Sequence, residues 1–180
     1  VCENTVINLT ASGADSYSLL VDGVDQGAVA ASFAYTATAS ATIQVVGVVS
    51  AAACPGLSNT ISVTIDKPVA TVSGSETICA GTDATYTATG GVEYAFFVDG
   101  VEVQARSNDD NYNSVALTNG QKVSAIAYST LGCASEMSNE VTVTVNALPS
   151  AGIVSDDADN TLCAGSAVTF TASTDFGDEF

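Results

Sequence analysis

The sequence contains the run Tyr94-Ala95-Phe96-Phe97-Val98-Asp99-Gly100-Val101-Glu102, and residues 17–25 carry nearly the same pattern. Each copy is an apolar stretch that ends in Asp-Gly and continues with a second apolar residue. Asp-Gly is a strong signal for a two-residue hairpin turn, because glycine tolerates the positive φ that such a turn requires. Both runs therefore predict a β-hairpin, and their similarity indicates an internal repeat.

The repeat extends well beyond the hairpin. Three segments align on Cys2, Cys79 and Cys163, and each is followed seven residues later by a large apolar residue and then Thr-Ala. A second cysteine, Cys54 or Cys133, precedes Ser-Asn and an alternating Val/Ile/Thr segment. These landmarks recur in one order about every 80 residues. We expect a first repeat over residues 1–66 that lacks its N-terminal strand, a complete repeat over 67–147, and the start of a third, truncated repeat over 148–180.

The chain opens on Val1-Cys2 and stops at Asp178-Glu179-Phe180, in the middle of this pattern, so we expect it to be a piece of a longer protein. The boundaries between repeats contain Pro68 and Pro149. Proline ends a strand and stiffens a short linker, which predicts a semi-rigid rod of neighbouring repeats.

Composition and periodicity predict an all-β fold. Val, Thr, Ile, Tyr and Phe favour strands, and apolar and polar residues alternate over 84–88, 94–98, 123–127 and 140–145. Turn signals recur with no helical period between them. We predict tandem antiparallel β-sandwiches of about seven strands each, immunoglobulin-like in architecture only, because the core Trp of that fold is missing.

The cysteines predict disulfides and an oxidising, extracytoplasmic location. The repeat spacing favours one bridge within each repeat, Cys2 with Cys54 and Cys79 with Cys133. Cys163 would then find its partner beyond Phe180. The cysteines are too widely spaced for a zinc site, and the chain has no His to activate a nucleophilic thiol.

The net charge of −17 argues against nucleic acid and anionic membrane surfaces as partners. No apolar run reaches the length of a membrane span. With no His, no phosphate-binding loop and no cleft for a tuned carboxylate pair, we expect no enzymatic activity.

The landmarks around Cys79, Asp99-Gly100, Cys133 and Ser138-Asn139 resemble the Ig-like repeats of very large cell-surface adhesins of Bacteroidota. They are similar to SprB-type gliding adhesins, which the type 9 secretion system exports. The resemblance implies an extracellular filament, anchored at the outer membrane and moved by the motility machinery. It also implies neighbouring repeats, surface polysaccharide or outer-membrane secretion and motility proteins as partners.

Two polar clusters are candidate sites. The turn Asp156, Asp157, Asp159, Asn160 offers oxygen ligands suited to calcium, the one cofactor that we consider, although a solvated polar turn is the interpretation that we favour. The loop with Asn108, Asp109, Asp110 and Tyr112 could contact a glycan or an ion, and an exposed polar loop is the default interpretation.

Three functions are therefore compared. The first is a structural or adhesive stalk repeat of a surface filament. The second is a glycan- or protein-binding module, which would need a patch of exposed aromatic residues. The third is an accessory domain of a secreted multidomain hydrolase, with the chemistry elsewhere in the longer chain.

Overall fold

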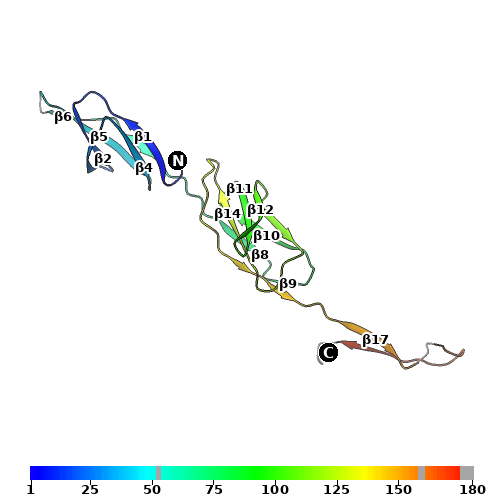
Figure 1. Ribbon diagram of the computed structural model, residues 1–180. Helices are drawn as coiled ribbons and strands as arrows, with labels where there is room; N and C mark the ends of the chain where they lie inside the picture. Colours follow the sequence, from blue (N-terminus) through cyan, green and yellow to red (C-terminus); the bar gives the residue numbers. More distant parts are fainter. Residues whose placement is uncertain (52–53, 158–160, 175–180) are drawn as a thin grey trace.

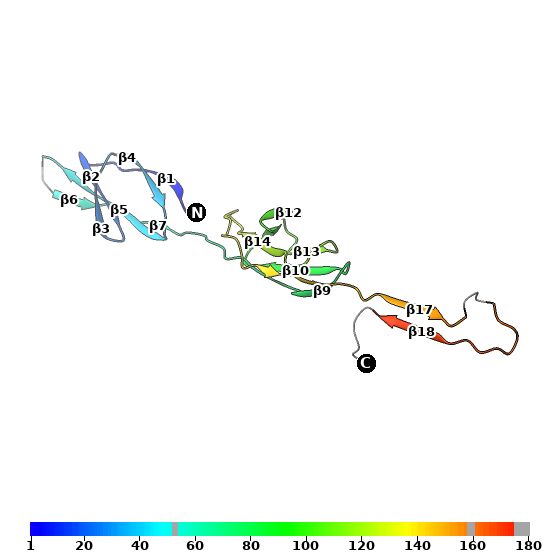
Figure 2. The ribbon, with the colours of Figure 1, turned by 60° about the horizontal axis from the view of Figure 1, so that its bottom comes forward.

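The computed structural model describes residues 1–51, 54–157 and 161–174. Every regular element in these ranges is a β-strand, and most pairs are antiparallel, which confirms the predicted all-β fold. Figures 1 and 2 show two sandwich-like units and a single hairpin that follow one another along an elongated molecule. The described residues form no helix that could cross a membrane.

The first repeat pairs its strands in two sheets. One sheet has two strands in the order β1-β4, and the other has the order β3-β2-β5-β6, with β7 also paired to β5. The strands are β1 (Thr5–Thr10), β2 (Ser16–Val21), β3 (Val24–Val29), β4 (Ser32–Ala37), β5 (Ala41–Val49), β6 (Cys54–Leu57) and β7 (Ile61–Val63).

The second repeat has a similar plan with nine strands in place of seven. Its sheets have the orders β13-β10-β8 and β12-β11-β14-β15, and a parallel pair, β16-β9, closes one end. The strands are β8 (Thr71–Gly74), β9 (Thr77–Cys79), β10 (Ala84–Thr89), β11 (Glu93–Val98), β12 (Val101–Ser107), β13 (Asn111–Ser114), β14 (Lys122–Tyr128), β15 (Val141–Thr142) and β16 (Thr144–Asn146). The parallel pair departs from the purely antiparallel expectation.

The third segment contributes one antiparallel hairpin, β17 (Ala151–Ser155) with β18 (Phe170–Thr174). Its large side chains are exposed, Ile153 at 71% and Phe170 at 63%. The matching pair in the second repeat is β8 with β10, where Tyr86 is fully buried. The apolar face of this hairpin is therefore uncovered in the described part of the chain.

The two Asp-Gly turns form as predicted. Asp22 and Gly23 have φ values of 50° and 79°, and Asp99 and Gly100 have values of 51° and 78°. Both central residues thus take the positive φ of the tight hairpin turn. The side chain of each aspartate also accepts a hydrogen bond from the neighbouring strand of the sheet. Asp22 accepts from the Thr42 N–H in β5 at 2.7 Å, and Asp99 accepts from the Lys122 N–H in β14 at 3.0 Å.

The hydrophobic core is larger in the second repeat. Its centre contains the fully buried side chains of Tyr86, Phe96, Val123 and Val143. In the first repeat only Leu19, Ala37, Ile43 and Val63 form a buried cluster, and other apolar side chains around it are partly exposed.

Candidate functional site: the junction between the first two repeats

A disulfide joins the first repeat to the second. Cys2 is bonded to Cys133, with an S–S distance of 2.05 Å and a Cα–Cα distance of 5.2 Å. The two residues are 131 positions apart in the sequence and belong to different repeats. The bond therefore closes the junction between the two sandwiches next to the linker at Pro68.

The strands place Cys2 at the end of its repeat that faces the linker. Cys2 forms a parallel bridge with Asp66, and the Asp66 N–H donates to the Val1 carbonyl at 2.8 Å. Cys133 lies in the loop after β14, where Tyr128 bridges Ala134, at the end of the second repeat that faces the linker. Since the linker brings these two ends together, the two sulfur atoms meet across the junction.

The pairing predicted from the sequence, Cys2 with Cys54 and Cys79 with Cys133, is wrong in this structure. The nine-residue strand β5 separates the two ends of the first repeat, since Ala41 pairs with Val63 at one end and Val49 with Cys54 at the other. A strand of that length spans about 30 Å. A disulfide needs Cα atoms within about 7 Å of each other, so the cysteines of one repeat cannot meet.

A signal for this arrangement was present in the sequence. Five strands lie between the two cysteines of the first repeat, β1 to β5, and each crosses the sandwich from one end to the other. An odd number of crossings places the second cysteine at the end opposite the first. The spacing of two cysteines in the sequence gives only the length of the loop between them. Whether the number of strands between them is odd or even decides whether they lie at opposite ends of the sandwich or at the same end.

Local contacts fix the loop that carries Cys133. The Ser129 hydroxyl accepts hydrogen bonds from the N–H groups of Leu131 and Cys133, and the Ser129 N–H donates to the Cys133 carbonyl at 2.9 Å. The Arg106 guanidinium lies 4.2 Å from the centre of the Tyr128 ring. These contacts hold Cys133, which is only 3% exposed, in place for the bond.

Arg106 also forms an ion pair with Glu93, and the other two basic residues of the chain are paired as well. At the junction, Lys67 lies 2.7 Å from Glu3 of the first repeat. The hydrogen bond that Lys67 donates to the Glu3 carboxylate, together with the charge of Glu3, raises the pKa of Lys67, and the charge of Glu136 in the second repeat adds to the effect. The Lys67 side chain is about half exposed, so the pair contributes little to stability. The pair places one cation between acidic groups of both repeats.

The predicted calcium turn is described only in part. A backbone hydrogen bond from Thr169 lowers the pKa of Asp156, whose carboxylate accepts the Thr169 N–H at 2.9 Å. One carboxylate oxygen of Asp157 is shielded from solvent and has no hydrogen-bond partner in the described structure. Asp159 and Asn160 lie outside the described residues. Within the ranges that are described, no three Asp, Glu, Cys or His side chains are placed to hold a metal ion, and calcium stays a prediction.

The predicted binding loop is divided by the fold. Asn108, Asp109 and Asp110 are exposed, and Asp109 and Asp110 accept hydrogen bonds from Asn111. Tyr112 instead packs inward, with its ring 5.8 Å from that of Phe96 in a stacked arrangement. The ring therefore belongs to the core, and the exposed part of the loop is polar without an aromatic platform. Binding at this loop stays a prediction.

No protein-family model and no curated protein matches the sequence. The fibronectin(III)-like modules of CbhA from Clostridium thermocellum are similar in structure, with a TM-score of 0.39, 16% identity, and coverage of 79% of this chain and 87% of that one. A 1.5-MDa bacterial ice-binding adhesin gives a TM-score of 0.42, 14% identity, and coverage of 85% of this chain. The match spans 62% of the adhesin chain.

Proposed function

We propose that this chain is part of an extracellular stalk, in which β-sandwich repeats are joined end to end and each junction is closed by a disulfide. The observation that carries the proposal is the bond between Cys2 and Cys133, which links two consecutive repeats. A disulfide across a junction limits hinge motion between neighbours, which is useful in a spacer and of no evident use in independent domains. A disulfide also fits an oxidising, extracytoplasmic location.

The same geometry recurs at the far end of the second repeat. Cys79 pairs with Asn146 in the parallel β9–β16 ladder, as Cys2 pairs with Asp66 in the first repeat. Cys79 is exposed and unbonded, and it lies next to the linker that leads to the third segment. A following repeat of this type would bring its own second cysteine to this position. We therefore propose that the first cysteine of each repeat pairs with the second cysteine of the next.

The resemblance in the sequence supports a finer assignment. Within this proposal the stalk belongs to a filamentous adhesin at the cell surface, anchored at the outer membrane and exported by type 9 secretion, and it acts in gliding or attachment without enzymatic activity. The strongly acidic surface fits such a role, because like charges along a rod favour extension and oppose self-association.

The experiment is a measurement of junction rigidity. Fluorophores are attached to one surface site in each of the first two repeats, and the spread of their distance is measured by single-molecule energy transfer in the oxidised chain and in the Cys2→Ser/Cys133→Ser variant. We expect a narrow distribution in the oxidised chain and a clearly broader one in the variant. The Cys79→Ser variant is the matched control and should behave like the oxidised chain. Equal distributions in all three proteins would contradict the proposal.

A further inference from the structure

Strand β4 leaves one edge of the first repeat unpaired. In the described structure β4 pairs with β1 alone, from Ser32 to Ala37 and in one unbroken register. The second repeat, in which the strand before β10 is present, keeps the corresponding edge open. Its sheet has the order β13-β10-β8, where β13 is the counterpart of β4. The open edge of β4 is therefore a feature of the repeat and does not depend on residues before Val1.

The main-chain groups of β4 alternate between the two sides of the strand. The Ala31 carbonyl accepts a hydrogen bond from the Ala11 N–H at 2.7 Å and so points toward β1. Because this direction alternates from one residue to the next, the N–H and C=O groups of Ser32, Ala34 and Thr36 point to the open side. An unpaired edge with such a row of donors and acceptors is a template for another strand.

Strand β4 also lies in a long stretch of the sequence without charge. Residues 26–65 contain no Asp, Glu, Lys or Arg, although the whole chain has a net charge of −17. Proteins commonly protect an open edge with charged side chains or with a bulge, because an unprotected edge pairs with other chains. The edge strands β3 and β12 of the larger sheets have such register shifts. Strand β4 has neither a bulge nor a charge.

The corresponding edge of the second repeat is covered. Asp110 directly precedes β13, and its carbonyl accepts the Ala88 N–H on the side of β10. The next carbonyl, that of Asn111, therefore points to the open side, where the Gln104 side chain donates to it at 3.2 Å. The strand registers place Gly27 of the first repeat where Gln104 stands in the second. Since glycine has no side chain, it cannot cover β4 in this way.

The sequence of β4 is nearly symmetrical about Ala34. With its flanking alanine it reads Ala-Ser-Phe-Ala-Tyr-Thr-Ala, so that small, hydroxyl and aromatic side chains recur in reverse order. In a second copy that runs antiparallel, with Ala34 opposite Ala34, Ser32 faces Thr36. Phe33 then faces Tyr35. The residues whose main-chain groups point to the open side become the hydrogen-bonded pairs of this register, and each side chain meets one of its own kind.

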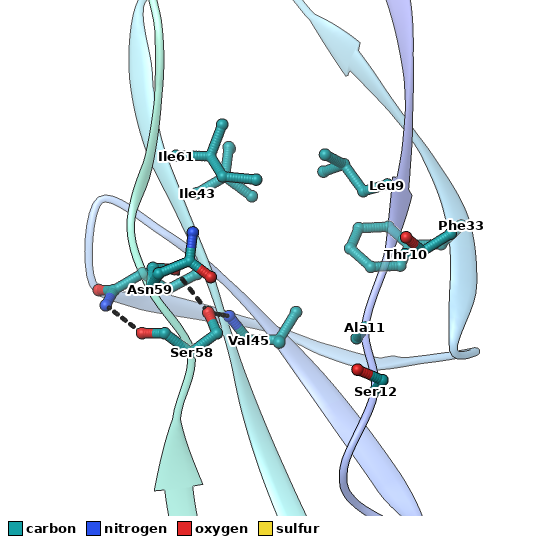
Figure 3. A pocket seen from close by; sticks show the side chains of 11 residues that line it. Leu9, Thr10, Ala11, Ser12, Phe33, Ile43, Val45, Ser58, Asn59 and Ile61 are labelled. Carbon is teal, nitrogen blue, oxygen red and sulfur yellow. Dashed lines mark hydrogen bonds between the residues drawn. The ribbon is translucent and has the colours of Figure 1, made fainter.

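The aromatic pair belongs to the inner face of the sheet. Phe33 and Tyr35 are partly buried and pack against the core of the first repeat. Figure 3 shows Phe33 beside Leu9 at the pocket between the two sheets. Opposite residues at a non-hydrogen-bonded position of an antiparallel pair have Cα atoms about 4.5 Å apart, so their side chains are in contact. Pairing of two β4 strands thus extends the inner apolar face across both copies.

We propose that β4 is a self-association edge, at which two copies of this chain pair antiparallel about Ala34. The β1-β4 sheets of the two copies then join through β4 in an isologous contact. In Figures 1 and 2 the strands of the first repeat run along the length of the molecule, so the partners lie side by side and point in opposite directions. This contact links neighbouring stalks laterally, whereas the disulfide links consecutive repeats of one stalk, and either can fail without the other.

Charge sets the conditions for this contact. The negative charge of each copy opposes association at long range, but the acidic residues of the first repeat all lie outside the charge-free stretch that contains β4. They are Glu3, Asp15, Asp22, Asp25 and Asp66. Salt screens exposed charges beyond about 8 Å at physiological ionic strength. Association through β4 should therefore strengthen as the salt concentration rises, whereas a contact held by ion pairs would weaken.

The test uses the full oxidised chain. Sedimentation over a dilution series should show a reversible monomer–dimer equilibrium that shifts toward the dimer at higher salt. Hydrogen exchange followed by NMR should show the amides of Ser32, Ala34 and Thr36 becoming protected as the protein concentration rises. The amide of Asn113, at the matching place on the β13 edge, is the internal control and should exchange at the same rate throughout.

Two matched pairs of variants test the edge itself. Ala34→Pro removes an N–H that β1 does not use, and it should weaken the dimer by about tenfold or more, because the two central intermolecular hydrogen bonds are lost. Ala34→Lys keeps that N–H and brings two like charges together at the symmetry axis, so it should weaken the dimer although it lowers the net negative charge. Asn113→Pro and Asn113→Lys are the controls and should leave the dimer unchanged.

Three outcomes would overturn the inference. The first is a chain that stays monomeric up to millimolar concentration at high salt. The second is a dimer that survives both Ala34 variants, which would place the contact elsewhere, such as the exposed face of the β17–β18 hairpin. The third is a dimer that the Asn113 variants dissociate equally, which would place the contact at β13.

Discussion

The two repeats share a strand plan but differ in how completely they cover their cores. In the second repeat β8 lies over the core and Val141 is 7% exposed, whereas in the first repeat the matching edge is open and Ile61 is 42% exposed. Their turn geometry is nearly the same, with both Asp-Gly pairs at positive φ. The comparison shows that local sequence signals form the hairpins, while burial depends on one additional strand.

The largest expected effect comes from the disulfide, which the two repeats share. If one repeat unfolds while the other remains folded, the bond closes a loop of about 65 residues, which corresponds to roughly 4 kcal/mol in the chain-entropy model. The Cys2→Ser/Cys133→Ser variant should therefore lower the stability of both repeats, with a fall in Tm on the order of 15 °C or more. Hydrogen exchange resolved by repeat measures this loss.

The matched control for that variant is Cys79→Ser, which changes an exposed, unbonded cysteine. It should leave both repeats at the stability of the parent chain. A loss confined to one repeat in the double variant would mean that the bond does not couple the two sandwiches.

A smaller effect separates the two cores. Val141→Ala should destabilise the second repeat by about 2 kcal/mol, because the side chain is buried and a cavity remains. Ile61→Ala should cost the first repeat about 1 kcal/mol or less, since that side chain is already partly in water. Urea unfolding with a probe in each repeat checks the difference. Equal costs would indicate that Ile61 is as well covered in solution as Val141.

The matching asparagines of the two repeats, Asn139 and Asn59, give a third, smaller contrast. Asn139→Ala removes both hydrogen bonds to Val72 and should destabilise the second repeat by about 1–2 kcal/mol. Asn59→Ala removes no side-chain hydrogen bond in the described structure and should leave the stability of the first repeat unchanged. Thermal unfolding of the two variants tests the contrast, and a similar loss in both would show that Asn59 already has a partner.

The smallest effect is the response to acid. A backbone hydrogen bond from Thr42 lowers the pKa of Asp22 below its ordinary value of 3.8, and the Thr42 hydroxyl adds to the effect. Because the folded-state pKa is depressed, the stabilisation is present above 3.8 and is lost as pH falls through the folded pKa. Asp22→Asn should flatten the acid limb of the stability profile of the first repeat. An unchanged profile between the parent chain and this variant would remove the proposed contribution.

Much of this architecture could be predicted from the sequence. The Asp-Gly turns and the alternating segments gave the correct hairpins because they act over a few neighbouring residues. The pairing of Cys2 could not be read from spacing, because it depends on which end of the sandwich each cysteine reaches. Tyr112 was predicted as an exposed contact because it follows a polar loop, but its register opposite Tyr86 turns the ring into the core.

The most direct test of the account is the disulfide map of the oxidised chain after cleavage at glutamate. Cleavage after Glu3, Glu76, Glu93, Glu102, Glu136 and Glu140 places every cysteine in a separate peptide. Mass spectrometry without reduction should then find residues 1–3 linked to residues 103–136. Residues 1–3 linked to residues 4–76, together with residues 77–93 linked to residues 103–136, would show bridges within each repeat and contradict the disulfide-closed junction.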